Sequence, residues 1–169
     1  MLERRILKNA EAALDVEQAD VLALTERATR ATFFTDDMTA EQLEANQRIP
    51  ELSGPAFFAA ARSRHQHLAA AFNRGRLAGF MIATRHAPDD LELDWLMVDP
   101  AEHGGGTAAA LMQEGLDWLG SDRLVWLTVI RHNHRAISFY RKFGFEIDPG
   151  AHLPRPVPSC IMRRQPIQG

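Results

Sequence analysis

The spacing of apolar residues in the first part of the chain predicts a strand followed by a helix. Residues 4–9 (RRILKN) are typical of a short first strand. Over residues 15–34 apolar side chains recur at helical spacing, and Asp15 is the expected N-cap of that helix.

A capping box indicates the start of a second, short helix at residues 39–48. Thr39 precedes Gln42 by three residues, the spacing at which each side chain can bond the other residue's backbone N–H. Proline and glycine in residues 49–55 (IPELSGP) are expected to break the chain. Residues 56–64 then predict a helical turn or two.

Two apolar runs separated by a short polar turn predict a β-hairpin. Its strands are residues 65–73 and 77–85, with Gly75 in the turn. Residues 91–98 (LELDWLMV) predict a central strand with one polar end. The alternation places Leu91, Leu93 and Trp95 on one face, and Glu92 and Asp94 on the other.

The last third of the chain alternates helices and strands. Residues 104–120 predict a helix, and residues 123–130 (RLVWLTVI) predict a strand that is buried on both faces. A second helix is capped by Asn133 and ends at Gly144, and residues 158–164 predict the last strand. The buried stripes are Ala108, Leu111, Met112, Gly115, Leu116 and Leu119 in the first helix, and Ala136, Phe139, Tyr140 and Phe143 in the second. The predicted fold class is α/β, a mixed central sheet flanked by helices.

Composition indicates a single globular domain over residues 1–169. The chain is 46% hydrophobic with a net charge of −3, which is ordinary for a soluble protein. No apolar run approaches the roughly 20 residues of a membrane span, and the first residues lack the apolar core of a secretory signal. We therefore expect a cytoplasmic protein with no membrane partner. The single cysteine, Cys160, excludes an intramolecular disulfide.

Charge is unevenly distributed along the chain. Residues 1–122 hold 20 acidic against 11 basic side chains, whereas residues 123–169 hold 8 basic against 2 acidic ones. The small negative total argues against nucleic acid as a partner, because such binding needs a basic surface. The division indicates either a plain solvated surface or a protein with an acidic end for a cation and a basic end for an anion.

Three consecutive glycines, Gly104, Gly105 and Gly106, lie between the central strand and the next helix. The start of a helix leaves N–H groups unpaired, and glycine lets a phosphate approach them closely. A P-loop is excluded because no lysine follows. A dinucleotide-binding fingerprint would need an acidic residue about 20 positions later, but residues 123–145 contain none.

Two segments resemble the GNAT superfamily of N-acetyltransferases. Residues 96–112 (LMVDPAEHGGGTAAALM) resemble its Gln/Arg-x-x-Gly-x-Gly/Ala signature, and residues 127–146 (LTVIRHNHRAISFYRKFGFE) resemble its Asn-x-x-Ala-x-x-Phe-Tyr-x-x-x-Gly-Phe stretch. The clear resemblance covers residues 91–145 and is most similar to a bacterial branch that includes polyamine acetyltransferases. It implies the GNAT fold and an enzyme that moves the acetyl group of acetyl-CoA to a primary amine in a ternary complex. The acceptor would be a small molecule or a peptide, and the resemblance allows a homodimer.

The resemblance also implies the residues that bind acetyl-CoA. The loop amides would hold the pyrophosphate, the strand would pair with the pantetheine, and the second helix would face the pantetheine arm and the sulfur. The residues implied are Met97, Val98, His103, Gly104, Gly105, Gly106, Thr107, Ala108, Asn133 and Tyr140.

Two loop positions depart from the family pattern. His103 replaces the usual Gln or Arg, and Gly105 occupies a position that is often basic. Each change removes a charge-assisted contact to phosphate. Basic residues of the second helix could compensate, and the candidates are Arg135, Arg141 and Lys142.

Acetyl transfer to an amine needs a base and a proton donor. Glu92 or Asp94, directly or through water, would take the ammonium proton, and Glu92 matches the position of the base in histone-modifying members of the family. Tyr140, the only tyrosine, would donate to the departing thiolate, while the N–H of Met97 or Val98 would polarise the thioester carbonyl. The alternatives are that the acids are solvated edge charges and that Tyr140 is a packed aromatic.

Other chemistry is less well supported by the sequence. Residues 33–38 (FFTDDM) offer aromatic and acidic side chains to an acceptor pocket, or simply form a packed and solvated turn. The histidine pairs in residues 65–67 and 132–134 lack a third ligand, so no metal is predicted. The alternative function is a non-catalytic acyl-CoA-binding regulatory module.

Overall fold

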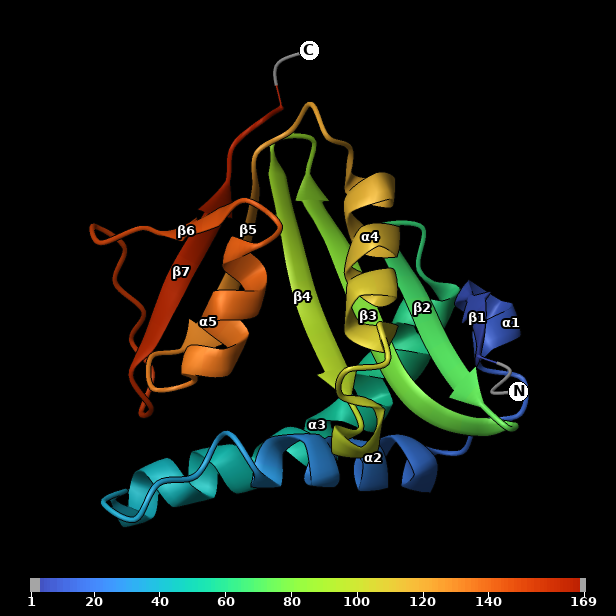
Figure 1. Cartoon of the computed structure of the whole chain (residues 1–169), viewed down its shortest axis with the longest axis horizontal. Coiled ribbons are helices and arrows are strands. Elements are labelled where there is room, and N and C mark those ends of the chain that lie inside the picture. Colours follow the sequence, from blue (N-terminus) through green and yellow to red (C-terminus); the bar gives the residue numbers. More distant parts are fainter. Residues whose placement is uncertain (1–3, 168–169) are drawn as a thin grey trace.

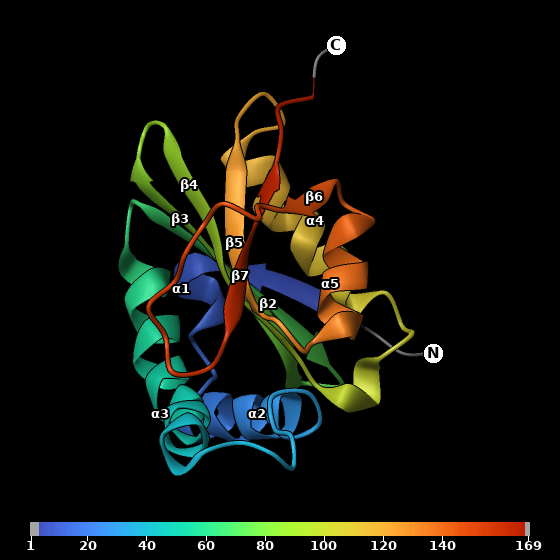
Figure 2. The ribbon, with the colours of Figure 1, turned by 90° about the vertical axis from the view of Figure 1, so that its left-hand side faces the viewer.

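A computed structural model describes residues 4–167 and shows a seven-stranded sheet with helices on both faces (Figures 1 and 2). The strand order is β1-β2-β3-β4-β5-β7-β6, and every pair is antiparallel except β4 with β5. The strands are β1 Arg4–Lys8, β2 Gln66–Asn73, β3 Arg76–Ala87, β4 Asp90–Val98, β5 Val125–Ile130, β6 Phe145–Ile147 and β7 Ser159–Arg164. The helices are α1 Asn9–Ala12, α2 Gln18–Arg30, α3 Ala40–Arg62, η1 Pro100–Glu102, α4 Thr107–Leu119 and α5 His134–Arg141. The predicted mixed α/β class is confirmed.

β4 and β5 are hydrogen-bonded at one end only. Leu91 lies opposite Val125 and Glu92 opposite Trp126, and no further pairs join the two strands in the described chain. Figure 1 shows the strands diverging from this end. The sheet is therefore split along part of its length, between strands that are central in the order.

The predicted hairpin of β2 and β3 is confirmed. Asn73 pairs with Arg76, and the two residues between them, Arg74 and Gly75, both have positive φ angles of 53° and 75°. Positive φ at both central residues is the geometry of a type I′ turn, which suits the twist of a two-residue hairpin.

The N-terminal caps of α2 and α3 determine where these two helices begin. The expected cap Asp15 is wrong, because α2 starts after Glu17, whose N–H donates to the Asp20 carboxylate at 2.9 Å. The capping box of α3 is confirmed, with the Gln42 N–H donating to Thr39 Oγ1 at 3.1 Å.

The segment that was expected to break the chain is instead the middle of α3. Pro50 and Pro55 both lie inside this helix. An interior proline removes a helical hydrogen bond and costs about 3 kcal/mol. The helix continues because its second half packs on the sheet: Phe57 is fully buried, and its ring lies edge-on to Phe80 at 5.5 Å. Tertiary packing thus overrides the local signal.

A β-bulge at Asp94 moves the side chains that follow it in β4 to the opposite face of the sheet. Ile82 and Ala83 of β3 lie opposite Trp95 and Leu93, so Asp94 is the extra residue. The expectation that Leu93 and Trp95 share a face is therefore wrong. Leu93 packs in the core against α4, whereas Trp95 packs in the core against α2 and α3.

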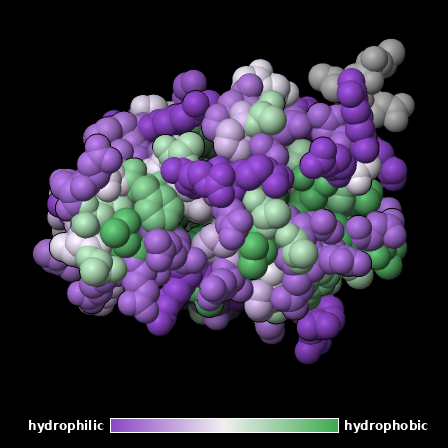
Figure 3. All heavy atoms as spheres, turned by 90° about the horizontal axis from the view of Figure 1, so that it is seen from below, coloured by the Kyte–Doolittle hydropathy of each residue, from purple (hydrophilic) through white to green (hydrophobic). Residues whose placement is uncertain are grey.

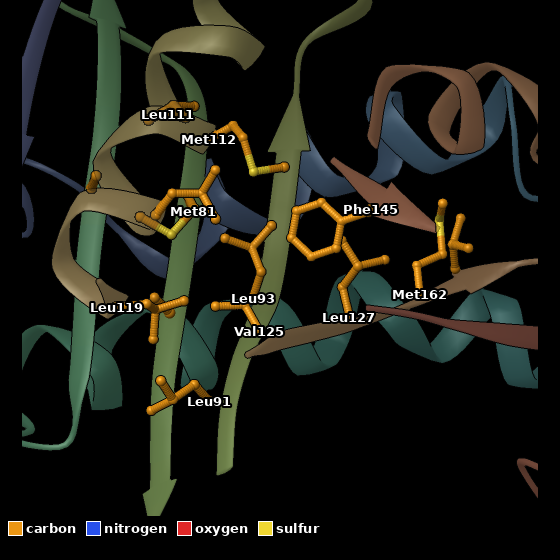
Figure 4. Packing of buried hydrophobic residues seen from close by; sticks show 14 of the residues in the cluster. Met81, Leu91, Leu93, Leu111, Met112, Leu119, Val125, Leu127, Phe145 and Met162 are labelled. Carbon is orange, nitrogen blue, oxygen red and sulfur yellow. The ribbon is translucent and has the colours of Figure 1, made fainter. Parts of the chain in front are cut away.

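Two hydrophobic cores fill the two faces of the sheet. Figure 2 shows α4 and α5 on one face and α1, α2 and α3 on the other. Figure 4 shows the packing of the first core around Met81, Leu93, Met112, Leu127 and Phe145. The second core is built on Leu24, Phe57, Leu68, Phe80 and Ile82.

β5 and α5 depart in detail from their predicted patterns. β5 is buried on one face only: Val125, Leu127 and Val129 are buried, and Trp126, Thr128 and Ile130 are half-buried. α5 ends at Arg141, and a turn leads from there to Gly144, whose φ is 90°. The one residue of this helix that counts as buried is Ile137, which the predicted stripe omits.

No helix within residues 4–167 is long and apolar enough to cross a bilayer. Seen from below, where α2 and α3 lie, the surface is mostly hydrophilic with separate apolar patches (Figure 3).

Gly115 allows α4 to lie close to the sheet. A Cβ at this position would come within 2.8 Å of both Leu93 Cδ1 and Met81 Sδ. We expect Gly115→Val to lower the free energy of unfolding by about 1–3 kcal/mol, the usual cost of overpacking a core. Urea denaturation measures this loss. Gln113→Val, at an exposed position of the same helix, is the control; equal losses in the two variants would contradict the close approach.

Candidate functional site

A cavity of ≈ 970 Å³ occupies the split between β4 and β5. It is lined by α4 and α5 from one face of the sheet and by α2 and α3 from the other, so it passes through the sheet. β4 contributes Glu92 to Val98, and β5 contributes Thr128 to Ile130. Thr128 and Ile130, on the half-buried face of β5, therefore border this cavity.

The glycine loop and the first turn of α4 present free amides to this cavity. Gly104 and Gly106 have φ angles of 84° and 81°, which a residue with a side chain rarely adopts. The first helical hydrogen bond of α4 runs from the Ala110 N–H to the Gly106 carbonyl. Within residues 4–167 no protein acceptor is found for the N–H groups of Gly104, Gly106, Thr107, Ala108 and Ala109, and all five residues line the cavity.

Gly105 differs from the other predicted loop residues. Its N–H donates to the Glu102 carbonyl at 3.1 Å, and it does not line the cavity. Its carbonyl accepts a hydrogen bond from Arg4 Nη1 at 2.8 Å. In a trans peptide the C=O and the following N–H point in opposite directions. Arg4 therefore orients the Gly106 N–H away from itself.

Basic side chains reach the cavity from α5. Arg135 and Lys142 line it, whereas Arg141 lies 3.7 Å from Glu146 and does not. His103 also lines the cavity, but burial, and then the charge of Arg135, lower its pKa. At neutral pH the positive charge here therefore comes from Arg135 and Lys142.

Tyr140 and Asn133 enter the cavity from α5 and its cap. Asn133 Oδ1 accepts from the Ala136 N–H at 3.2 Å, so its amide nitrogen is left to face a ligand. The Tyr140 ring packs edge-on against Phe139 and Phe145, with centroids 5.7 and 6.2 Å away. Burial raises the pKa of Tyr140 to about 12, so the hydroxyl keeps its proton near neutral pH.

Two carboxylates lie in the cavity wall where β4 begins to leave β5. Burial, and then the charge of Asp94, raise the pKa of Glu92, and burial raises the pKa of Asp94. Glu92 Oε1 lies 2.8 Å from His86 Nε2. Asp94 Oδ2 accepts from Thr84 Oγ1 at 3.1 Å. A raised pKa brings a carboxylate closer to the range of a general base that works near neutral pH.

The opposite end of the cavity is closed by α2, α3 and a C-terminal loop. Phe33 lines it, but Phe34, Asp36 and Asp37 do not, so only part of the predicted FFTDDM contribution reaches the site. Asp37 instead accepts from Thr35 Oγ1 at 2.7 Å.

The C-terminal loop is attached to α3. Gln42 Nε2 donates to the Pro156 carbonyl at 3.1 Å, and the neighbouring Arg155 lines the cavity. Sequence reasoning missed both Arg155 and the loop's part in the site, because only tertiary contact brings this loop to α3.

The histidine pairs and Cys160 give no support for a metal site. No group of three potential ligands that could hold a metal occurs in the described part of the chain. His67 lies 3.0 Å from Glu114 Oε2, and Cys160 is buried in the core.

Comparison with known proteins finds a family match that covers more of the chain than the two sequence motifs. Residues 24–145 match the model of the family described as acetyltransferase (GNAT) family. An uncharacterized N-acetyltransferase of Mycobacterium bovis is 45% identical over 78 residues, covering 44% of this chain and 49% of that protein. A protein of Mycobacterium tuberculosis with the same description matches equally well. The chain therefore matches about half the length of these curated relatives.

Solved structures share the fold over nearly the whole chain. The PaiA N-acetyltransferase of Thermoplasma acidophilum, solved in complex with coenzyme A, has a TM-score of 0.73 at 20% identity and covers 98% of this chain and 99% of its own. The ribosomal-protein-S18-alanine N-acetyltransferase of Escherichia coli has a TM-score of 0.63 at 18% identity, with 99% and 96% covered. At such identities the likeness establishes the fold alone.

Proposed function

We propose that this chain, which belongs to the GNAT family of acetyltransferases, moves the acetyl group of acetyl-CoA to a primary amine by direct attack in a ternary complex. The observation that carries the proposal is that free amides at a helix start, a protonated tyrosine, one buried carboxylate and one half-buried carboxylate line one continuous cavity. Such amides suit a pyrophosphate anion, and a carboxylate suits an ammonium acceptor.

The residues present fit acetyl-CoA as the co-substrate. Arg135 and Lys142 add positive charge near the loop, and the edge of β4 at Met97 and Val98 leaves main-chain groups for the pantetheine amides. Asn133 offers its amide nitrogen to the same arm. The pyrophosphate donors are the N–H groups of Gly104, Gly106, Thr107, Ala108 and Ala109; Gly105 is left out because its N–H is already bonded.

The chain's own groups supply each proton transfer. Glu92, with Asp94 or water as the alternative, takes a proton from the acceptor ammonium and exposes the nitrogen lone pair. The N–H of Met97 or Val98 polarises the carbonyl under attack. Tyr140 donates its proton to the departing thiolate and regains one from the nitrogen that has been acetylated.

The alternative of a non-catalytic acyl-CoA-binding module needs only the loop. The raised pKa values of Glu92 and Asp94 and the protonated Tyr140 favour the enzyme, because binding alone gives no reason to hold two acids with raised pKa values in the same cavity. A dinucleotide oxidoreductase is disfavoured by the antiparallel pairing of β1 to β4, since that fold needs a parallel sheet.

The acceptor is a small-molecule or peptide amine with an apolar body. Phe33, Ile49 and Trp95 provide apolar wall at the α2–α3 end of the cavity. A polyamine, as the branch resemblance implies, would have to place its charges on Glu92, Asp94 or Glu102, which line the cavity, because Asp36 and Asp37 do not reach it. The polyamine acceptor, the homodimer and the cytoplasmic location stay predictions.

Binding of acetyl-CoA through the glycine loop is tested by Gly106→Val. A side chain here would strain a φ of 81°, and its Cβ would come within 3.4 Å of Arg4 Nη1, the group that orients the Gly106 amide. Loss of one charge-assisted hydrogen bond costs about 1.5–3 kcal/mol, so we expect at least about tenfold weaker binding by calorimetry. Gly75→Val strains a φ of 75° in the hairpin turn, away from the cavity, and controls for strain. Unchanged affinity in Gly106→Val would remove the loop from the binding site.

The base is tested by the pH dependence of Glu92→Gln. This variant should depress kcat/KM most near neutral pH, and less at alkaline pH, where the acceptor is already deprotonated. Since burial raises the pKa of Glu92, the acidic limb of the parent profile should lie above the ordinary carboxyl value of 4.5. Asp94→Asn is the comparison variant. A profile identical to the parent's would leave Asp94 or water as the base.

The proton donor is tested by Tyr140→Phe, which keeps the ring and its packing. An interaction made chiefly in the transition state lowers kcat and kcat/KM together. We expect both to fall about ten- to a thousandfold, the smaller loss applying if water replaces the hydroxyl. Acetyl-CoA affinity and the melting temperature should hardly change. Normal turnover with a good acceptor would reduce Tyr140 to a packed aromatic.

A further inference from the structure

Glu92 connects the cavity with the outside of the protein. Its carboxyl group lines the cavity and is only 9% exposed. The ring of His86, 2.8 Å away through Nε2, is absent from the cavity wall and is 41% exposed. A proton that reaches Glu92 from the cavity therefore has an ionisable, solvent-exposed group as its next neighbour.

Asp94 has no comparable route. It accepts from Thr84 Oγ1, and that hydroxyl in turn accepts from Gln66 Nε2 at 3.1 Å. Neither a threonine hydroxyl nor a glutamine amide gains a proton near neutral pH. The two acids thus differ in what lies behind them, although both line the same cavity.

The proposed reaction must release one proton in each turnover. The ammonium loses one proton before it attacks, and it loses a second as the C–N bond forms and the C–S bond breaks. The thiolate takes one proton through Tyr140 and leaves as a neutral thiol. The other proton has to reach solvent while both substrates fill the cavity.

We propose that His86 carries this proton from Glu92 to solvent. The inference rests on the proposed function, with Glu92 as the base. The protonated carboxyl group gives its proton to the unprotonated Nε2 of neutral His86, and the resulting imidazolium releases the proton on Nδ1 to water. Because the ring is exposed, exchange with solvent restores the Nδ1–H tautomer before the next turnover. His86 touches no substrate and acts only through Glu92.

The ring of His86 is held in place for this task. It stacks on Trp126 with centroids 6.0 Å apart and planes 22° apart. Trp126 Nε1 donates to Asp90 Oδ1 at 2.7 Å, which fixes the indole in turn. Trp126 is the β5 residue opposite Glu92, so the last pair of the β4–β5 ladder also positions the relay.

The charges around the pair determine the pH at which it works. His86 faces Glu92, Asp90 and Asp94, and the hydrogen bond that its protonated ring donates to the Glu92 carboxylate is the main cause that raises its pKa above 6.5. Arg155 faces Glu92 and Asp94 from the C-terminal loop and opposes the rise in their pKa values. The active form, with Glu92 ionised and His86 neutral, accumulates as pH rises through the pKa of the coupled pair.

The variant His86→Gln distinguishes a role of His86 in carrying a proton from a role in positioning Glu92. The glutamine amide can still donate to Glu92 Oε1, but it cannot accept and pass on a proton. With an acceptor found by screening amines for thiol release, we expect kcat to fall about tenfold or more and the KM for both substrates to stay within twofold. The acidic limb of kcat should move to lower pH, and added imidazole should restore part of the rate. His65→Gln, at an exposed histidine of the neighbouring strand region, is the matched control.

Two outcomes would overturn the relay. An unchanged kcat with an unchanged acidic limb would show that the proton leaves by another route. A loss that imidazole does not restore, with the limb unmoved, would show that His86 only supports the fold.

The pairing of His86 with Glu92 can also be tested by a measurement that does not depend on turnover. The NMR titration of His86 should give a pKa above 6.5 in the parent and a lower one in Glu92→Gln; an unchanged value would contradict the pairing itself. If the parent binds acetyl-CoA but acetylates no amine, the proposed function fails while this titration still reports on the pair.

Discussion

Hydrogen bonding between β4 and β5 ends at Glu92, and the rest of the site depends on that ending. Main-chain polar groups inside a sheet are almost always paired, because an unpaired buried N–H or C=O is costly. A split between central strands is therefore stable only where solvent or a ligand can reach the freed groups. Here the freed edge of β4 borders a cavity of ≈ 970 Å³ that opens to both faces of the sheet. The same split separates α4 from α5 and lets their cavity-facing ends approach one ligand.

The bulge at Asp94 gives the split its chemistry. Because side chains alternate along a strand, one extra residue moves everything after it to the opposite face. Leu93 remains under α4, while Trp95 turns toward α2 and α3, at the end of the cavity proposed to take the acceptor. A regular β4 would place the indole against α4 and disturb the packing that Gly115 permits. The core and the acceptor wall therefore both require the irregularity.

Local signals in the sequence predicted the elements, and tertiary contacts account for most of what they missed. The Thr39 capping box, the Gly75 hairpin and the glycine loop follow from interactions over a few residues, and the structure contains all three. The continuation of α3 through Pro50 depends on Phe57 meeting Phe80, which no local pattern reveals. The bulge escaped notice for the same reason, since alternation in one strand does not show how its neighbour pairs. The His86–Glu92 contact had a signal that could have been used, because the short β3–β4 hairpin brings these two positions together.

Both parts of the unevenly charged sequence contribute to the cavity wall. Glu92 and Asp94 belong to the acidic first part of the chain, whereas Arg135, Lys142 and Arg155 belong to the basic last part, and all five line the same space. The two sets form no direct ion pair with one another in residues 4–167. That separation matters, because a carboxylate paired with arginine has a lowered pKa and is a poor base. With a histidine and a hydroxyl as partners instead, the two acids keep raised pKa values. Arg135 and Lys142 are left free for an anion. The proposed reaction needs a cavity that holds a phosphate and deprotonates an amine at once, and this absence of direct ion pairs meets that need.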